Sequence, residues 1–193
     1  MQILVWHTFY KYENTVGPHA VQPDMGRYPY YLQDTRRRPE KRGLQILRDM
    51  TISAMEHKDI DGLARLEKIC FSTPWTRAGL EAELSFPPAV FIVAHIGGEI
   101  AGYAGMHRAA GECYVDNVAV FPEFRRQGVG EELMRGLILR ARENDGEFIS
   151  LEVRKSNSQA IELYSKLGFV QAGVRRDFYD KPREDALILT LYF

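Results

Sequence analysis

The chain has 193 residues, of which 45% are hydrophobic and 26% are charged, and its net charge is -1. This composition is typical of a soluble globular protein whose core needs no disulfide or metal to stabilise it. Two unrelated cysteines and five scattered histidines exclude a disulfide framework and the common metal motifs, and no apolar run reaches the ~20 residues that span a bilayer. We therefore expect a cytoplasmic protein that binds no metal and no membrane.

The first 49 residues differ in kind from the rest. They carry a net charge of +3, against -4 for residues 50–193, and they hold four of the nine prolines. Aromatic residues lie there close to a basic run at 36–38, and no helical or strand period is visible. We predict a poorly ordered N-terminal extension over 1–49 and one domain over 50–193. A nucleic-acid-binding arm, with arginine on phosphate and aromatic rings on bases, and translation from Met50 remain open alternatives.

From Thr51 the hydrophobic pattern is regular and predicts an α/β domain, a mixed sheet with helices packed on it. Asp59 or Asp61 is the expected cap of the first helix, and the Gly97-Gly98 pair predicts a hairpin turn. In chain order we expect a strand at 51–56, a helix carrying residues 60–69, a helix at 77–84, strands at 90–94, 100–106 and 114–121, a long helix with its apolar face at 133–141, a strand at 148–153, a helix at 157–167 and strands at 169–178 and 186–193.

The most informative segment runs from a predicted strand through a turn directly into a helix. Gly128 and Gly130 allow close approach to the backbone, and the unpaired N–H groups of a first helical turn favour a phosphate or pyrophosphate. A Walker loop is excluded, because Glu131-Glu132 stands where that motif requires lysine and serine or threonine. A dinucleotide-binding GxGxxG motif is excluded, because Leu133 stands where it requires glycine. What remains is Arg125-x-x-Gly128-x-Gly130, which matches the signature of the GNAT acetyltransferase superfamily; an ordinary strand–helix turn is the alternative.

A second motif follows at 150–169. Ser156-x-x-Gln159 is a capping-box pattern, and Asn157 lies at the start of the predicted helix. Asn157 and Tyr164 are seven residues apart and therefore share one helix face, while Glu152 lies at the end of the preceding strand. A carboxylate and a phenol are thus expected to converge at the carboxyl end of a strand beside the glycine turn, which is a common place for a site in an α/β sheet.

The segment 150–169, SLEVRKSNSQAIELYSKLGF, resembles the corresponding block of the bacterial ribosomal-protein-alanine N-acetyltransferases, a branch of the GNAT superfamily. Residues 71–75 and 175–186 resemble two further segments of that family in the same order, whereas residues 1–49 have no counterpart in it. The resemblance implies the GNAT acyl-CoA N-acyltransferase fold, with a mixed, mostly antiparallel central sheet flanked by helices. It also implies acetyl-CoA as co-substrate and direct attack without a covalent acyl-enzyme.

The resemblance further implies the roles of individual residues. Glu152 would be the general base, directly or through a water, and Tyr164 would protonate the leaving thiolate. A solvated strand-end glutamate and a core aromatic are the alternatives. Cys113 has nothing nearby that would activate it. The coenzyme would lie against the backbone of Val118, Ala119 and Val120, which polarises the acetyl carbonyl, and against Arg125, Arg126, Gln127, Gly128, Val129, Gly130 and Asn157.

The acceptor implied by the resemblance is a protein N-terminus, the alanine of a small-subunit ribosomal protein. Such an α-amine has a pKa of ~7.7–8.0, so the base has a modest task, and the acidic domain suits a basic peptide. Pro74-Trp75 and the segment 175–185 are the expected acceptor groove. A lysine side chain, a polyamine or a small-molecule antibiotic remains an alternative acceptor, and a coenzyme-A-binding module without catalysis is an alternative of another class.

Overall fold

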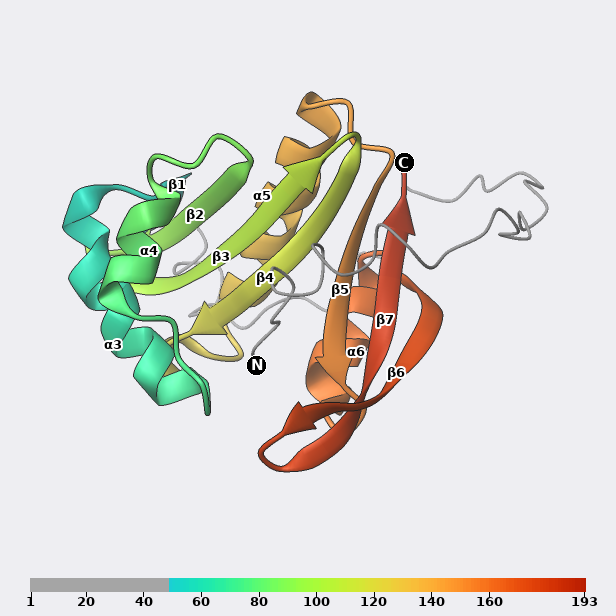
Figure 1. Cartoon of the computed structure of the whole chain (residues 1–193). Helices are drawn as coiled ribbons and strands as arrows, with labels where there is room; N and C mark the ends of the chain where they lie inside the picture. Colours follow the sequence, from blue (N-terminus) through green and yellow to red (C-terminus); the bar gives the residue numbers. More distant parts are fainter. Residues whose placement is uncertain (1–48) are drawn as a thin grey trace.

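Seven strands form one twisted sheet with helices on both faces (Figure 1). This computed structural model describes residues 49–193, so the predicted N-terminal extension lies, apart from Asp49, outside the described residues. In chain order the elements are β1 (Met50–Ala54), η1 (His57–Asp59), α3 (Ile60–Cys70), α4 (Arg77–Glu83), β2 (Ala89–Ile96), β3 (Glu99–Ala109), β4 (Glu112–Val120), η2 (Pro122–Phe124), α5 (Val129–Glu143), β5 (Phe148–Arg154), α6 (Ser158–Lys166), β6 (Val170–Asp180) and β7 (Arg183–Tyr192).

The sheet is mixed and mostly antiparallel, as expected, with the strand order β1-β2-β3-β4-β5-β7-β6. The parallel neighbours are β4 and β5, and they pair only over Glu112–Tyr114 with Phe148–Ser150. Beyond that point β5 stays paired with β7 as far as Arg154, while β4 stays paired with β3 as far as Val120. The two central strands therefore diverge towards their carboxyl ends, as Figure 1 shows.

Two hydrophobic clusters hold the helices to the sheet. On one face, the apolar stripe of α5 predicted from the sequence is buried at Leu133, Leu137 and Ala141, and α6 packs beside it. On the other face, Leu63 and Leu66 of α3 pack in a second cluster with residues of α4, β2 and β3. Each fully buried leucine contributes about 1.5–3 kcal/mol relative to exposure, so both layers fix the sheet that carries the site.

The helix ends differ in part from the sequence-based expectation. Asp59 is the N-cap residue of α3, but its carboxylate accepts the Glu56 N–H at 2.9 Å and so closes the preceding turn. At α6 the cap is Asn157, whose Oδ1 accepts the Ala160 N–H at 3.2 Å. The predicted Ser156-x-x-Gln159 capping box is wrong, because Ser156 lies outside the helix and its N–H donates to Glu184.

The closing strands form a tighter hairpin than the pattern suggested. The two strands were expected to be separated by a connection over 179–185, but the pairing runs on to Tyr179 opposite Glu184 and Asp180 opposite Arg183. The register shifts between Arg175 and Tyr179, so that residues 176–178 of β6 lie opposite the single residue Asp185 of β7 and form a bulge. This hairpin lies beside the carboxyl end of β5 (Figure 1). Within residues 49–193 no helix is long and apolar enough to cross a membrane.

A buried histidine links α4 to the central strands. The Nδ1 atom of His107, on β3, lies 2.6 Å from Asp116 of β4, and its Nε2 atom lies 2.8 Å from Glu83 of α4. Burial opposes a charge on His107, but the two carboxylates outweigh it and raise the pKa of the imidazole to about 9. His107 is therefore an imidazolium at neutral pH, held between two anions.

This network makes the stability of the domain depend on pH. The pKa of His107 is raised above the ~6.5 of an unfolded chain, so its contribution is fully present below pH 6.5 and is lost as the pH rises through 9. We expect the free energy of unfolding to fall by about 1–3 kcal/mol between pH 7 and 9.5, measured by urea denaturation. The double variant His107→Gln, Asp116→Asn keeps polar side chains without the charges and should lose most of this slope. An equal slope in both proteins contradicts the assignment.

Candidate active site

Glu152 lies on β5 at the point where β4 has moved away. Its neighbours Leu151 and Val153 point into the core beneath α5 and α6, so its side chain lies on the opposite face of the sheet. It is 7% exposed, and its Oε1 atom lies 3.1 Å from Nη1 of Arg175 on β6. Burial raises the pKa of Glu152, and the Arg175 guanidinium lowers it in part. A buried carboxylate with one cationic partner is a suitable proton acceptor.

Tyr164 comes from α6 and is buried on the face that packs against the sheet. Its ring centroid lies 5.7 Å from that of Phe169. Burial raises the pKa of the phenol, with a smaller contribution from Tyr179, so the hydroxyl stays protonated at neutral pH. This suits a proton donor, and it equally suits a core aromatic. The role of Tyr164 as general acid thus stays a prediction.

The glycine turn leads directly into α5, as the sequence predicted, and its backbone conformation is a further observation. Gly128 is the N-cap residue of α5 with φ +86°, a left-handed conformation that disfavours any side chain. A Cβ atom at Gly130 would find its nearest neighbours at 3.8 Å, in Leu163 and Val120. Glycine at 130 is therefore not demanded by packing within the chain. Both features fit a ligand that approaches the N-terminus of α5 closely, as a coenzyme diphosphate would.

Other side chains of the turn contact the protein itself. The Arg125 Nε atom donates to the Val120 carbonyl at 3.0 Å, and its Nη2 atom lies 3.4 Å from the sulfur of Cys70. Arg125 therefore ties the end of β4 to α3, an arrangement that the motif did not indicate. Gln127 donates to the Glu123 carbonyl at 2.6 Å. A direct contact of these side chains, or of Arg126, with the coenzyme stays a prediction.

The edge of β4 that faces β5 has no strand partner over Val118, Ala119 and Val120, although the Val120 carbonyl accepts a hydrogen bond from Arg125. Within the described sheet, the pairing of β4 with β5 stops at Tyr114. Backbone N–H and C=O groups in a sheet require partners, so an unpaired edge next to the glycine turn offers hydrogen bonds to an extended ligand. The pantetheine arm of coenzyme A is such a ligand. Asn157 follows β5 closely in the sequence, but its side-chain oxygen accepts the Ala160 N–H and caps α6.

A buried carboxylate that the sequence analysis did not single out anchors the loop between α3 and α4. Glu67 accepts the Trp75 N–H at 2.7 Å and Nδ2 of Asn117 at 3.0 Å, and it also accepts the hydroxyl of Tyr103. Burial raises the pKa of Glu67, and these donors lower it in part. A glutamate beside Leu63 and Leu66 on the apolar face of α3 was the signal that could have revealed this anchor.

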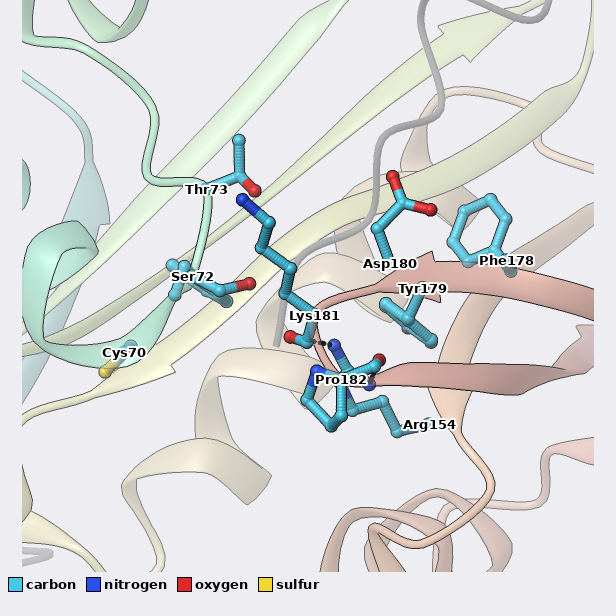
Figure 2. Close-up of a pocket in the computed structure, with 10 residues that line it drawn as sticks. Cys70, Ser72, Thr73, Arg154, Phe178, Tyr179, Asp180, Lys181 and Pro182 are labelled. Carbon is cyan, nitrogen blue, oxygen red and sulfur yellow. Dashed lines mark hydrogen bonds between the residues drawn. The ribbon is translucent and has the colours of Figure 1, made fainter.

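A cavity of about 380 Å³ lies between the α3–α4 loop and the β6–β7 hairpin (Figure 2). Arg154 of β5 fixes the hairpin, because its guanidinium donates to the carbonyls of Lys181 and Pro182 at 3.0 and 2.9 Å and pairs with Glu184 at 3.1 Å. Figure 2 shows the Lys181 side chain extending across the cavity towards the loop. The lining residues are Cys70, Phe71, Ser72, Thr73, Arg154, Phe178, Tyr179, Asp180, Lys181 and Pro182.

One of the two expected acceptor segments lines this cavity, and the other lies next to it. The hairpin contributes residues 178–182 of the predicted segment 175–185, whereas the opposite wall is formed by Cys70 at the end of α3 and by residues 71–73 of the loop, and Pro74-Trp75 follows just after them. Cys70 lines this cavity, and its sulfur lies 3.8 Å from the Val120 carbonyl at the end of β4, a position near the sheet that we did not predict for this cysteine. In residues 49–193 no group of His, Cys, Asp and Glu side chains is arranged to hold a metal ion.

Comparison with known proteins agrees with this geometry. The family model of the acetyltransferase (GNAT) family matches residues 60–169, which run from the start of α3 through the glycine turn to the end of α6. The chain belongs to the GNAT family. It is accordingly an N-acetyltransferase that uses acetyl-CoA as co-substrate.

Two relatives and one solved structure show which GNAT proteins this chain is similar to. The chain is 33% identical over 143 residues to the ribosomal protein bS18-alanine N-acetyltransferase of Escherichia coli K12, covering 73% of this chain and 96% of that protein. It is 38% identical over 136 residues to a Bacillus subtilis protein that carries the same name provisionally, covering 70% and 90%. The crystal structure of the Escherichia coli ribosomal-protein-S18-alanine N-acetyltransferase superposes with a TM-score of 0.68 at 32% identity, covering 74% and 93%.

Substitution of the two glycines of the turn by alanine should have different effects on stability and on coenzyme binding. Gly128→Ala places a side chain at φ +86° and should lower the free energy of unfolding by about 1–2 kcal/mol. Gly130→Ala fits the protein and improves helix propensity, so stability should change by less than ~1 kcal/mol. It should nevertheless weaken acetyl-CoA binding by about tenfold or more, equal to ~1.4 kcal/mol, in calorimetric titration. Unchanged affinity in Gly130→Ala means that the coenzyme does not approach this backbone.

Proposed function

We propose that this protein transfers the acetyl group of acetyl-CoA to the N-terminal α-amine of a protein that begins with alanine, a small-subunit ribosomal protein. The observation that carries the proposal is the buried Glu152 carboxylate at the divergence of β4 and β5. Glu152 is linked to the loop–hairpin cavity by Tyr179, which lines the cavity and whose hydroxyl donates to the Glu152 carbonyl at 3.4 Å. The names of the Escherichia coli and Bacillus subtilis relatives support the same acceptor.

The proposed chemistry is direct transfer. Glu152 takes a proton from the acceptor α-amine, directly or through one water, and the neutral nitrogen attacks the thioester carbon. The N–C bond forms as the C–S bond breaks. Backbone N–H groups along Val118–Val120 stabilise the negative charge that develops on the carbonyl oxygen, and Tyr164 gives its proton to the departing sulfur. The N-terminus of α5, with Gly128 and Gly130, would hold the diphosphate of the coenzyme.

The acceptor would enter through the cavity between the α3–α4 loop and the β6–β7 hairpin. Both walls of the cavity are anchored to regular elements, the loop by Glu67 of α3 and the hairpin by Arg154 of β5, so the entrance is held in place before a substrate binds. The polar groups of Ser72, Thr73 and Asp180 at this cavity offer hydrogen bonds to a peptide backbone. This arrangement favours a free chain terminus over a lysine side chain on the surface of a folded protein.

We place the protein in the cytoplasm, where ribosomal proteins are made, and we assign the catalytic domain to residues 50–193. No membrane or nucleic acid takes part in the proposed reaction. Binding of RNA through the basic residues of 1–49 is a separate proposal, which predicts a salt-sensitive RNA affinity that is lost when those residues are deleted.

Mass spectrometry of acetylated peptides tests the proposed function. The full chain is mixed with acetyl-CoA and a basic peptide that begins with alanine, or with the same peptide bearing a blocked N-terminus and a free lysine. We expect acetylation of the free α-amine only, slowed by about 10²–10⁴-fold in Glu152→Gln because the base is lost. Glu162→Gln, an exchange in α6 outside the site, serves as the matched control and should react at the wild-type rate.

The other outcomes have distinct meanings. Turnover of the lysine peptide alone would keep the fold and the chemistry but replace the α-amine by a lysine side chain or another amine. Acetyl-CoA binding without turnover of either peptide, unaffected by Glu152→Gln and Tyr164→Phe, would instead identify a coenzyme-A-binding module without catalysis.

A further inference from the structure

We infer that Arg175 is a positioning residue for the proton-transfer step: its guanidinium orients the Glu152 carboxylate and holds it in the ionised form that accepts the proton of the amine. This inference rests on the proposed role of Glu152 as base. It assigns a function to a side chain of β6 that the glycine turn and the 150–169 block do not contain.

The first support is the ion pair itself. The Nη1 atom of Arg175 lies 3.1 Å from Oε1 of Glu152. Ile188 of β7 pairs with Glu152, and Ala186 of the same strand pairs with Arg175, so the arginine reaches diagonally across β7 to the carboxylate. Alanine at position 186 is buried and small, and it leaves room on this face of the sheet for the long side chain to cross.

The second support is that the other nearby arginine is already occupied. Arg154 lies two residues after Glu152 and therefore on the same face of β5. Its guanidinium pairs with Glu184, donates to the hairpin carbonyls and lies 4.1 Å from the centroid of the Tyr179 ring. Arg154 is therefore bound to the hairpin, and the cation that pairs with the Glu152 carboxylate is Arg175.

The third support is the local structure of β6, which fixes Arg175 before any substrate binds. Directly after Arg175 the strand bulges, and Asp177 adopts φ +53°. The Asp177 N–H donates to Oδ1 of Asp185 at 2.9 Å, and the Asp177 carboxylate accepts from Arg183 at 2.7 Å. This bulge brings the Phe178 ring to 5.4 Å from the Arg175 guanidinium. The arginine is thus held from two sides, by an aromatic face and by the carboxylate.

The charges around Glu152 make a cation necessary for its proposed role. Tyr179 of β6 and Tyr114 and Asp116 of β4 also face the carboxylate, and Arg175 is the positive group among these neighbours. Burial raises the pKa of Glu152 and favours its neutral form, which cannot accept a proton. Arg175 opposes that effect. Since the Arg175 side chain is 35% exposed, water can solvate it when Glu152 becomes neutral during the reaction.

The pH dependence of kcat/KM separates a positioning role from a binding role. Arg175→Gln should move the acidic limb of the profile upwards by ~1 unit, so that kcat/KM on that limb falls about tenfold, with a smaller change in KM for the acceptor. Arg175→Lys should restore part of the shift, because a charge returns without the planar geometry. The exposed Arg140 of α5, which lies outside the proposed site, is changed to Gln as the matched control and should leave the profile unchanged.

A carboxyl-carbon NMR titration of the coenzyme-free protein gives a readout without turnover. The Glu152 signal, assigned by its absence in Glu152→Gln, should titrate at a higher pH in Arg175→Gln than in wild type. Thermal unfolding shows whether each variant is folded. If Arg175→Gln fails to fold, the pH profile and the NMR titration are measured on Arg175→Lys instead. A raised KM with an unmoved acidic limb and an unmoved titration would overturn the inference and make Arg175 an acceptor contact. Wild-type activity in Glu152→Gln is a different result, which removes the proposed base itself.

Discussion

The divergence of β4 and β5 after three residue pairs is the constraint on which the rest of this structure depends. Each strand remains held on its other side, β4 by β3 and β5 by β7, so the opening lies in the middle of a rigid sheet. Its edges carry backbone groups that need partners, which makes the opening a place for an extended ligand. The glycine turn follows β4 on one side of this opening, and Glu152 lies on β5 at the other side.

Three buried carboxylates on the same face of the sheet show how the surroundings separate structural from chemical roles. Glu67 is surrounded by hydrogen-bond donors from the α3–α4 loop and the sheet, and Asp116 is bonded to the imidazole of His107. Changing the protonation of either would leave buried partners unsatisfied, which is costly. Glu152 instead has one partly exposed partner, Arg175, and can gain a proton at a lower cost.

Contacts between distant elements explain why some predictions from local motifs were right and others were wrong. The apolar stripe of α5, the hairpin turn at Gly97-Gly98 and the glycine turn that opens onto α5 follow from short-range rules, and the structure confirms them. The capping box at Ser156 failed, because Glu184 of a distant strand captures its N–H and the next residue caps the helix. Arg125 likewise turns towards β4 and α3, because the Val120 carbonyl and Cys70 are brought there by the fold.

The sequence by itself determined the order and type of nearly all elements and the position of the glycine turn, because hydrophobic period and turn chemistry depend on neighbours a few positions apart. The residues expected to do the chemistry were implied by the resemblance to a known family. The tertiary structure alone decided the divergence of β4 from β5, the anchoring of the Trp75 loop by Glu67 and the pairing of Arg175 with Glu152. These features join residues on different elements, and whether such residues meet depends on strand order and register, which local patterns do not encode.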